Sequence, residues 1–122
     1  MKEREKKMKK MKKILFYGMT GEKMCFNHIL LNALDLHEAG NEVKIIFEGA
    51  SVKLVPVFEE EKFPTYMKAK EKGLIAGVCK ACSVMMKVDT AVVESGLPIL
   101  SDMNGHAGIR KFLDEGYEII SM

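Results

Sequence analysis

Tryptophan is absent from this 122-residue sequence, which also contains only three prolines and three cysteines. Three cysteines cannot all pair within one chain, and Cys79 and Cys82 are only three positions apart, so the disulfide framework of a small secreted domain is excluded. No apolar stretch approaches the ~20 residues that a membrane helix needs. The apolar run at 14–17 is also too short for the hydrophobic region of a signal peptide. We therefore expect a cytoplasmic protein with no membrane association.

The excess of positive charge is confined to one end of the chain. The formal net charge is +2, yet residues 1–13 hold eight Lys or Arg and two Glu, a net +6. Residues 14–122 hold 11 basic and 15 acidic residues, a net −4, which argues against a nucleic-acid-binding fold. We expect residues 1–12 to form a basic N-terminal extension, either a solvated tail or a patch for RNA or acidic partners. Residues 13–122 have the length of a single domain.

After this extension, short apolar runs alternate with longer runs of helical spacing. The apolar runs predict five strands, at residues 13–18, 43–49, 74–79, 98–101 and 117–121. Strands that alternate with helices are joined by right-handed crossovers into a parallel sheet. The sequence therefore predicts an α/β fold, a three-layer α/β/α sandwich around a five-stranded parallel sheet, flavodoxin-like in architecture.

The helical segments are marked by capping residues and by glycines. We expect a first helix that Thr20 caps and Gly40 ends, and a short helical turn at 51–57 that Pro56 ends. Residues 59–62 read as a solvated loop. The remaining helices are predicted at 64–72, 83–94 and 109–115.

Ligands of parallel sheets collect beyond the carboxyl ends of the strands. Four of the predicted strands lead into segments that we expect at one edge, namely residues 19–23, 48–51, 79–83 and 101–106. The first of these, within Gly18–Lys23, resembles a phosphate-binding loop but lacks the spacing and ending of a P-loop. It is a tight turn or a weak anion site, which leaves a nucleotide-binding regulator as one reading.

The strongest chemical signal is the pair Cys79 and Cys82, which follows a strand and opens a helix. A thiol in the first helical turn faces unpaired N–H groups and the positive end of the dipole, and Lys80 adds charge, so the thiolate is favoured. The alternative is two small buried apolar residues without chemistry. His106 lies on a loop at the same edge, where it orients a substrate or assists proton transfer, or has no chemical role.

Two further readings of the cysteines are open. Cys25 and His28 have C-x2-H spacing, so that with Cys79 and Cys82 they would supply a Cys3His zinc set. His28 is more simply a half-buried helix residue. A CxxC pair after a strand also suggests a thioredoxin-like dithiol, but that fold needs an antiparallel portion and usually a cis-proline facing the pair.

Three segments together resemble the DsrE/DsrF-like family. They are FEG at 47–49, CKACSVMMKV at 79–88 and GLPILSDMNGHAGIRKFLDEGYEII at 96–120, and the resemblance covers residues 12–122. It implies a five-stranded parallel α/β/α sandwich that assembles as a dimer, trimer or hexamer. Family members with a cysteine at the end of the third strand carry sulfane sulfur as a persulfide, towards tRNA thiolation or sulfur oxidation. That cysteine falls on Cys79.

The chain departs from the family pattern beside this cysteine. Cys82 is an additional thiol, and Met85, Met86 and Lys87 stand where sulfur-relay members often carry Arg and Gly, so the identity of the partners does not transfer. The leading hypothesis is a sulfur carrier without a cofactor, in which Cys79 accepts sulfur, Cys82 is a resolving or second thiol and His106 orients. It would work with sulfur donor and acceptor proteins. The alternative is a non-catalytic redox-sensing or zinc-binding oligomeric module.

Overall fold

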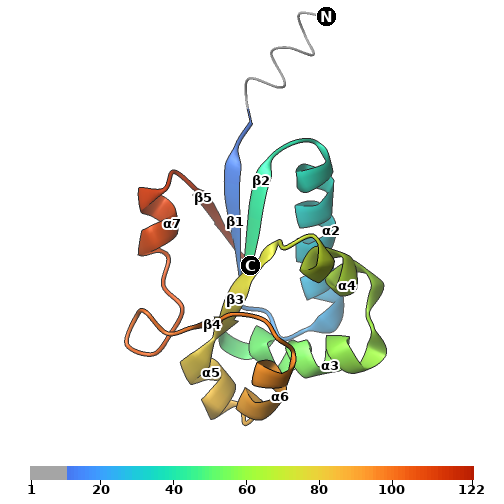
Figure 1. The fold of residues 1–122 in the computed structure, drawn as a ribbon, viewed down its shortest axis with the longest axis vertical. Coiled ribbons are helices and arrows are strands. Elements are labelled where there is room, and N and C mark those ends of the chain that lie inside the picture. The colour runs from blue at the N-terminus through green and yellow to red at the C-terminus, as the bar shows by residue number, and fades with distance from the viewer. Residues whose placement is uncertain (1–10) are drawn as a thin grey trace, which may run out of the picture.

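A single five-stranded sheet, in which every strand pairing is parallel, forms the centre of the protein (Figure 1). The structure is a computed structural model that describes residues 11–122, so nearly all of the predicted basic extension lies outside the described residues. The spatial order is β4-β3-β2-β1-β5. These strands are β1 (Lys13–Gly18), β2 (Glu42–Phe47), β3 (Ile75–Cys79), β4 (Ile99–Leu100) and β5 (Glu118–Ser121). The predicted α/β fold with five parallel strands is confirmed.

The helices divide unequally between the two faces of the sheet. They are α2 (Lys23–Glu38), the 3-10 helix η1 (Gly49–Lys53), α3 (Leu54–Glu61), α4 (Pro64–Glu71), α5 (Lys80–Met85), α6 (Asp89–Glu94) and α7 (Arg110–Asp114). Figure 1 shows α2, α3 and α4 on one side of the sheet and α7 alone on the other. The strands β1 to β4 follow one another in space, so right-handed crossovers carry their helices to one face. The return to β5, on the far side of β1, places α7 on the opposite face.

Two helix boundaries differ from the prediction. Glu22, not Thr20, caps α2, because its carboxylate accepts the backbone N–H of Cys25 at 3.0 Å. Pro56 does not end a helical turn but lies in the first turn of α3, where a missing N–H breaks no intrahelical bond. The helix α3 then runs through residues 59–61, for which the sequence predicts a loop.

The predicted helix at 83–94 is two short helices. The first, α5, begins three residues earlier than predicted, at Lys80, and Lys87 has a φ of 61° in the break before α6. This left-handed residue interrupts the helix, and no glycine or proline in the sequence marks it. The break leaves α5 as a short helix of six residues directly after β3.

Aromatic packing fills the side of the sheet that α2 covers. The Phe26 and Phe47 rings stack with centroids 4.4 Å apart, and Phe58 packs against Tyr66 at 5.3 Å. All four side chains are buried. Burial of such rings dominates the stability of a small core, so this side fixes the sheet on which the strand ends are held.

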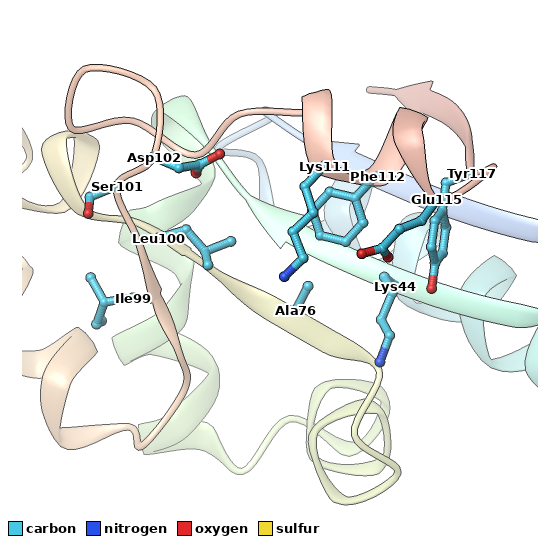
Figure 2. A pocket seen from close by; sticks show the side chains of 10 residues that line it. All are labelled: Lys44, Ala76, Ile99, Leu100, Ser101, Asp102, Lys111, Phe112, Glu115 and Tyr117. Atoms are coloured by element: carbon cyan, nitrogen blue, oxygen red, sulfur yellow. The ribbon is translucent and has the colours of Figure 1, made fainter.

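The side that α7 covers is partly open. A groove of about 670 Å³ runs between the sheet and α7, with Ala76 and Leu100 on its floor and Lys44 and Lys111 beside it (Figure 2). Its apolar end is formed by the Phe112 ring, which packs edge-on against Tyr117. The third layer of the sandwich is therefore thin. Over residues 11–122, none of the helices combines the length and the hydrophobicity that crossing a bilayer requires.

Candidate functional site

Four side chains from three neighbouring strand ends converge at the carboxyl edge of the sheet. Glu48 follows β2, Cys79 ends β3, Cys82 lies in the first turn of α5 and His106 lies in the loop after β4. One ligand atom from each lies within 4.8 Å of all the others. The structure thus brings together the three predicted site residues and adds Glu48 to them.

Cys79 is the most enclosed of the four. It has no exposed surface, caps α5, and its Sγ receives the Cys82 N–H at 3.4 Å. Burial raises the pKa of its thiol to about 12, with the neighbouring Glu48 adding to the rise and the Cys82 N–H opposing it. The expectation that the helix start favours a Cys79 thiolate is therefore wrong for the reduced protein, because desolvation outweighs the backbone N–H groups of Cys82 and Ala107.

Cys82 lies nearer the surface, with 8% of its area exposed. Its Sγ accepts the backbone N–H of Gly49 at 3.2 Å. Gly49 has a φ of 59°, a left-handed conformation that glycine adopts without strain, and this turn after β2 aims the N–H at the sulfur. Cys82 is therefore the thiol of the pair that combines some access to solvent with a donor for negative charge.

His106 contacts both sulfurs through the same nitrogen. Its Nδ1 lies 3.2 Å from the Cys79 Sγ and 3.5 Å from the Cys82 Sγ. A tight turn holds the ring in place, since Met103 and His106 exchange two backbone hydrogen bonds of 2.8 Å. The Gly105 carbonyl in that turn also accepts the Ala81 N–H at 2.9 Å, which ties the loop to α5. About a third of the His106 side chain is exposed, so the cluster reaches solvent at the imidazole.

Glu48 is the site residue that the sequence analysis did not single out. Its side chain is 8% exposed, and its Oε2 lies 3.6 Å from the Nδ1 of His106. Its Oε1 is buried and has no hydrogen-bond partner among the described residues. The signal in the sequence was a charged residue directly after an apolar strand, at an edge already expected to carry the site.

Tyr17, on β1, borders the cluster from the next strand. Its hydroxyl donates to the Ala107 carbonyl at 2.7 Å, beside the turn that carries His106. Burial raises the pKa of the Tyr17 hydroxyl well above its usual value, and Glu48 and the two cysteines add to the rise. Tyr17 therefore stays protonated and contributes no charge to the site.

The Cys3His zinc set is not assembled. Cys25 and His28 are both exposed on α2, and neither belongs to the cluster. His28 is thus not half-buried, as the helical pattern suggested. Phe26, Ile29 and Leu30 form the buried face of α2. Cys25 and His28 lie on the other side of the helix and therefore face solvent.

The structure also bears on two other readings of the sequence. The thioredoxin-like reading is wrong because every strand pairing in the sheet is parallel. The segment Gly18–Lys23 joins β1 to α2, and the Glu22 carboxylate already accepts the Cys25 N–H at the start of α2. Its negative charge opposes the binding of an anion there.

The assembled groups allow two kinds of chemistry. An imidazole in contact with two thiols can take a thiol proton, and the adjacent Glu48 carboxylate stabilises the resulting imidazolium. Thiolate, imidazole and carboxylate are also the ligands that zinc prefers. The cluster of Glu48, Cys79, Cys82 and His106 is thus a candidate redox or metal site.

Comparison with known proteins gives one informative relative. The chain is 37% identical over 98 residues to the "Uncharacterized protein MJ0733" of the archaeon Methanocaldococcus jannaschii, and the match covers 78% of each chain. No family model matches the chain. No solved structure gives a significant match.

Proposed function

The chain belongs to the same family as protein MJ0733 of Methanocaldococcus jannaschii. We propose that it is a cytoplasmic sulfur carrier of the DsrE-like type. It holds a sulfane sulfur as a cysteine persulfide. The observation that carries the proposal is the convergence of two thiols on one imidazole nitrogen, at 3.2 and 3.5 Å. The five-stranded parallel sheet with a cysteine at the end of β3 is consistent with the DsrE-like family.

Loading is a transfer between two sulfur compounds with no net oxidation. A donor persulfide, R–S–SH, approaches Cys82, and His106 Nδ1 accepts the thiol proton. The Cys82 sulfur attacks the outer sulfur of the donor, so one S–S bond forms while the donor S–S bond breaks. The donor leaves as R–SH after taking the proton back from His106, and Cys82 carries –S–SH.

Access and hydrogen bonding favour Cys82 over Cys79 as the first acceptor. The family resemblance points to Cys79, but that sulfur has no exposed surface and its thiol pKa is raised to about 12. Cys82 is 8% exposed and receives the Gly49 N–H, which stabilises negative charge on sulfur. Nucleophilic attack requires both access and thiolate character.

Cys79 then governs how long the persulfide survives. If its thiolate attacked the inner sulfur of the Cys82 persulfide, a Cys79–Cys82 disulfide would form and hydrogen sulfide would leave. The raised pKa keeps Cys79 protonated at neutral pH, and a thiol is a far weaker nucleophile than a thiolate. A protonated Cys79 beside the loaded sulfur thus protects the cargo until an acceptor arrives.

Transfer requires partner proteins, and we propose a sulfur donor, a sulfur acceptor and a homo-oligomer. The thin α7 side of the sheet supports an assembly, because its groove exposes Ile99 beside the half-buried Leu100 (Figure 2). Light scattering measures the mass in solution. A purely monomeric protein at micromolar concentration would contradict the oligomer without touching the thiol chemistry.

Mass spectrometry tests the proposal directly, because trypsin places each cysteine on its own peptide. Cys25, Cys79 and Cys82 fall on residues 24–44, 73–80 and 81–87. After exposure of the reduced protein to a sulfane donor and blocking of thiols, we expect an added mass of one sulfur atom, about 32 Da, on residues 81–87. Reductant should remove it.

Matched variants assign the adduct. Cys82→Ser should abolish it, whereas Cys25→Ser, at an exposed position outside the cluster, should leave it unchanged. An adduct on residues 73–80 alone would make Cys79 the acceptor, as the family resemblance has it. The absence of an adduct from both peptides would exclude the sulfur-carrier function.

A further inference from the structure

We propose that Glu48, Cys79, Cys82 and His106 form a tetrahedral binding site for a zinc ion. The site requires no residue outside the cluster already described. The proposal goes beyond sulfur carriage and stands without it, since it needs only the four side chains and their geometry.

The distances around His106 match the edges of a zinc tetrahedron. Zn–N bonds of about 2.0–2.1 Å, Zn–O bonds of about 2.0–2.2 Å and Zn–S bonds of about 2.3 Å, at tetrahedral angles, place N and S about 3.6 Å apart and N and O about 3.4 Å apart. The Nδ1 atom lies 3.2 and 3.5 Å from the two sulfurs and 3.6 Å from the Glu48 Oε2. These three separations therefore match a bound zinc ion, and all four donor atoms lie within 4.8 Å of one another.

Glu48 points independently to a cation. More than nine-tenths of its side chain is buried, and its Oε1 has no hydrogen-bond partner among the described residues. Within residues 11–122, no Lys or Arg forms an ion pair with it, and His106 is the basic group that contacts it. A buried carboxylate is costly unless a positive charge or a metal compensates it.

The ligand types select the metal. Two thiolates with one imidazole and one carboxylate suit a borderline-soft ion with tetrahedral preference, as zinc is. Calcium and magnesium require six or more oxygen ligands in total, and the site offers a single carboxylate. Zinc is also redox-inert, so its binding would leave both cysteines reduced.

Backbone contacts prepare the ligands for a metal. The Gly49 N–H donates to the Cys82 sulfur at 3.2 Å and the Cys82 N–H to the Cys79 sulfur at 3.4 Å. Such donors offset the charge of two thiolates and a carboxylate around one divalent ion. The turn from Met103 to His106 fixes the imidazole, so little order has to be gained on binding.

Zinc and persulfide would exclude each other at this site, because both occupy the cysteine sulfurs. Metal occupancy would hold the thiols in a protected form that a sulfane donor cannot load. Sulfur transfer, if the chain performs it, would then depend on the metal-free fraction of the protein.

The first experiment measures metal binding alone. Reduced, metal-stripped protein is titrated with Zn²⁺ against a chromophoric chelator and, separately, with Co²⁺ under anaerobic conditions. We expect one metal per chain, intense visible bands of tetrahedral Co²⁺ and a thiolate-to-cobalt charge-transfer band. Weak octahedral bands, or no binding at micromolar metal, would overturn the site. Neither readout involves a sulfane donor. Failure of the carrier function would therefore leave the metal-binding result unchanged.

Variants then test three of the four ligands. Glu48→Gln, Cys82→Ser and His106→Gln should each weaken Zn²⁺ binding by at least about tenfold, since even outer partners of metal ligands cost that much. Cys25→Ser and His28→Gln change the same residue types at exposed positions and should bind as the parent does. If Glu48→Gln and His106→Gln bound zinc with parental affinity, the thiols alone would hold the metal and the four-ligand site would be wrong.

X-ray absorption on the unaltered zinc-loaded protein tests the ligand set even where a variant fails to fold. The expected first shell is two sulfur and two nitrogen or oxygen neighbours, with distances of about 2.3 Å and about 2.0–2.1 Å. A shell of four sulfurs, or one without sulfur, would refute the assignment.

Discussion

The Nδ1 atom of His106 lies 3.2 Å from the Sγ of Cys79, although 27 positions separate the two residues in the chain. The connection is made by the sheet. Cys79 ends β3, Leu100 pairs with it on β4, and the loop that follows β4 returns His106 over the strand ends. The imidazole thus meets the thiols because two neighbouring parallel strands end at the same edge.

His106→Gln removes the proton acceptor that this contact provides. We expect persulfide loading of the metal-free protein to slow by about a hundredfold, within the range that a positioned general base contributes. The rate is measured as the growth of the adduct on residues 81–87. His28→Gln, on the exposed face of α2, is the control and should load at the parental rate. Equal rates for both variants would remove His106 from the mechanism.

The raised pKa of Cys79 predicts its reactivity towards alkylating agents. With a pKa of about 12 instead of the ordinary value of 9.0, its thiol stays protonated at pH 8 and the thiolate gains population only as the pH rises towards 12. In native, metal-free protein we expect residues 73–80 to be alkylated at least about a hundredfold more slowly than in denaturant. The exposed Cys25 should differ far less between the two states. Comparable rates for Cys79 in both states would contradict the buried, protonated thiol.

Gly77 controls the approach of β4 to β3. A Cβ at this position would lie 2.6 Å from the Leu100 Cγ and 2.9 Å from the Pro98 carbonyl oxygen. Gly77→Ala should therefore lower the free energy of unfolding by about 1–3 kcal/mol, the usual cost of overpacking, as measured by urea denaturation. It should also slow persulfide loading, because β4 leads into the turn that holds His106.

A double variant separates the two clashes at Gly77. Adding Leu100→Ala removes the side-chain contact but leaves the Pro98 oxygen, which also accepts the Val78 N–H at 2.9 Å. We expect only partial recovery of stability relative to Leu100→Ala alone. Full recovery would show that the backbone contact is unimportant.

Deletion of residues 2–10 should leave both stability and thiol chemistry unchanged. The described fold begins with β1 at Lys13, and the site lies at the opposite end of the strands. Thermal unfolding and persulfide loading of the shortened chain provide the check. A large loss of stability would show that the basic head is part of the fold and that the predicted domain boundary is wrong.

Local sequence patterns determined the architecture. The β-branched and apolar runs predicted all five strands to within a few residues, because burial on both faces of a parallel sheet demands such runs. The break at Lys87 and the course of the chain through Pro56 were missed, since neither depends on local composition. The end of α5 and the continuation of α3 are set by what packs against them.

The sequence by itself determined that Cys79, Cys82 and His106 lie at the carboxyl edge of the sheet, since strand periodicity and chain order require it. Only the tertiary structure decided that Glu48 joins them and that Cys25 and His28 do not. The rotation of α2 about its axis and the aim of a side chain after β2 depend on packing across the whole core. The raised pKa of Cys79 was decided in the same way, because desolvation arises from every element that encloses the thiol.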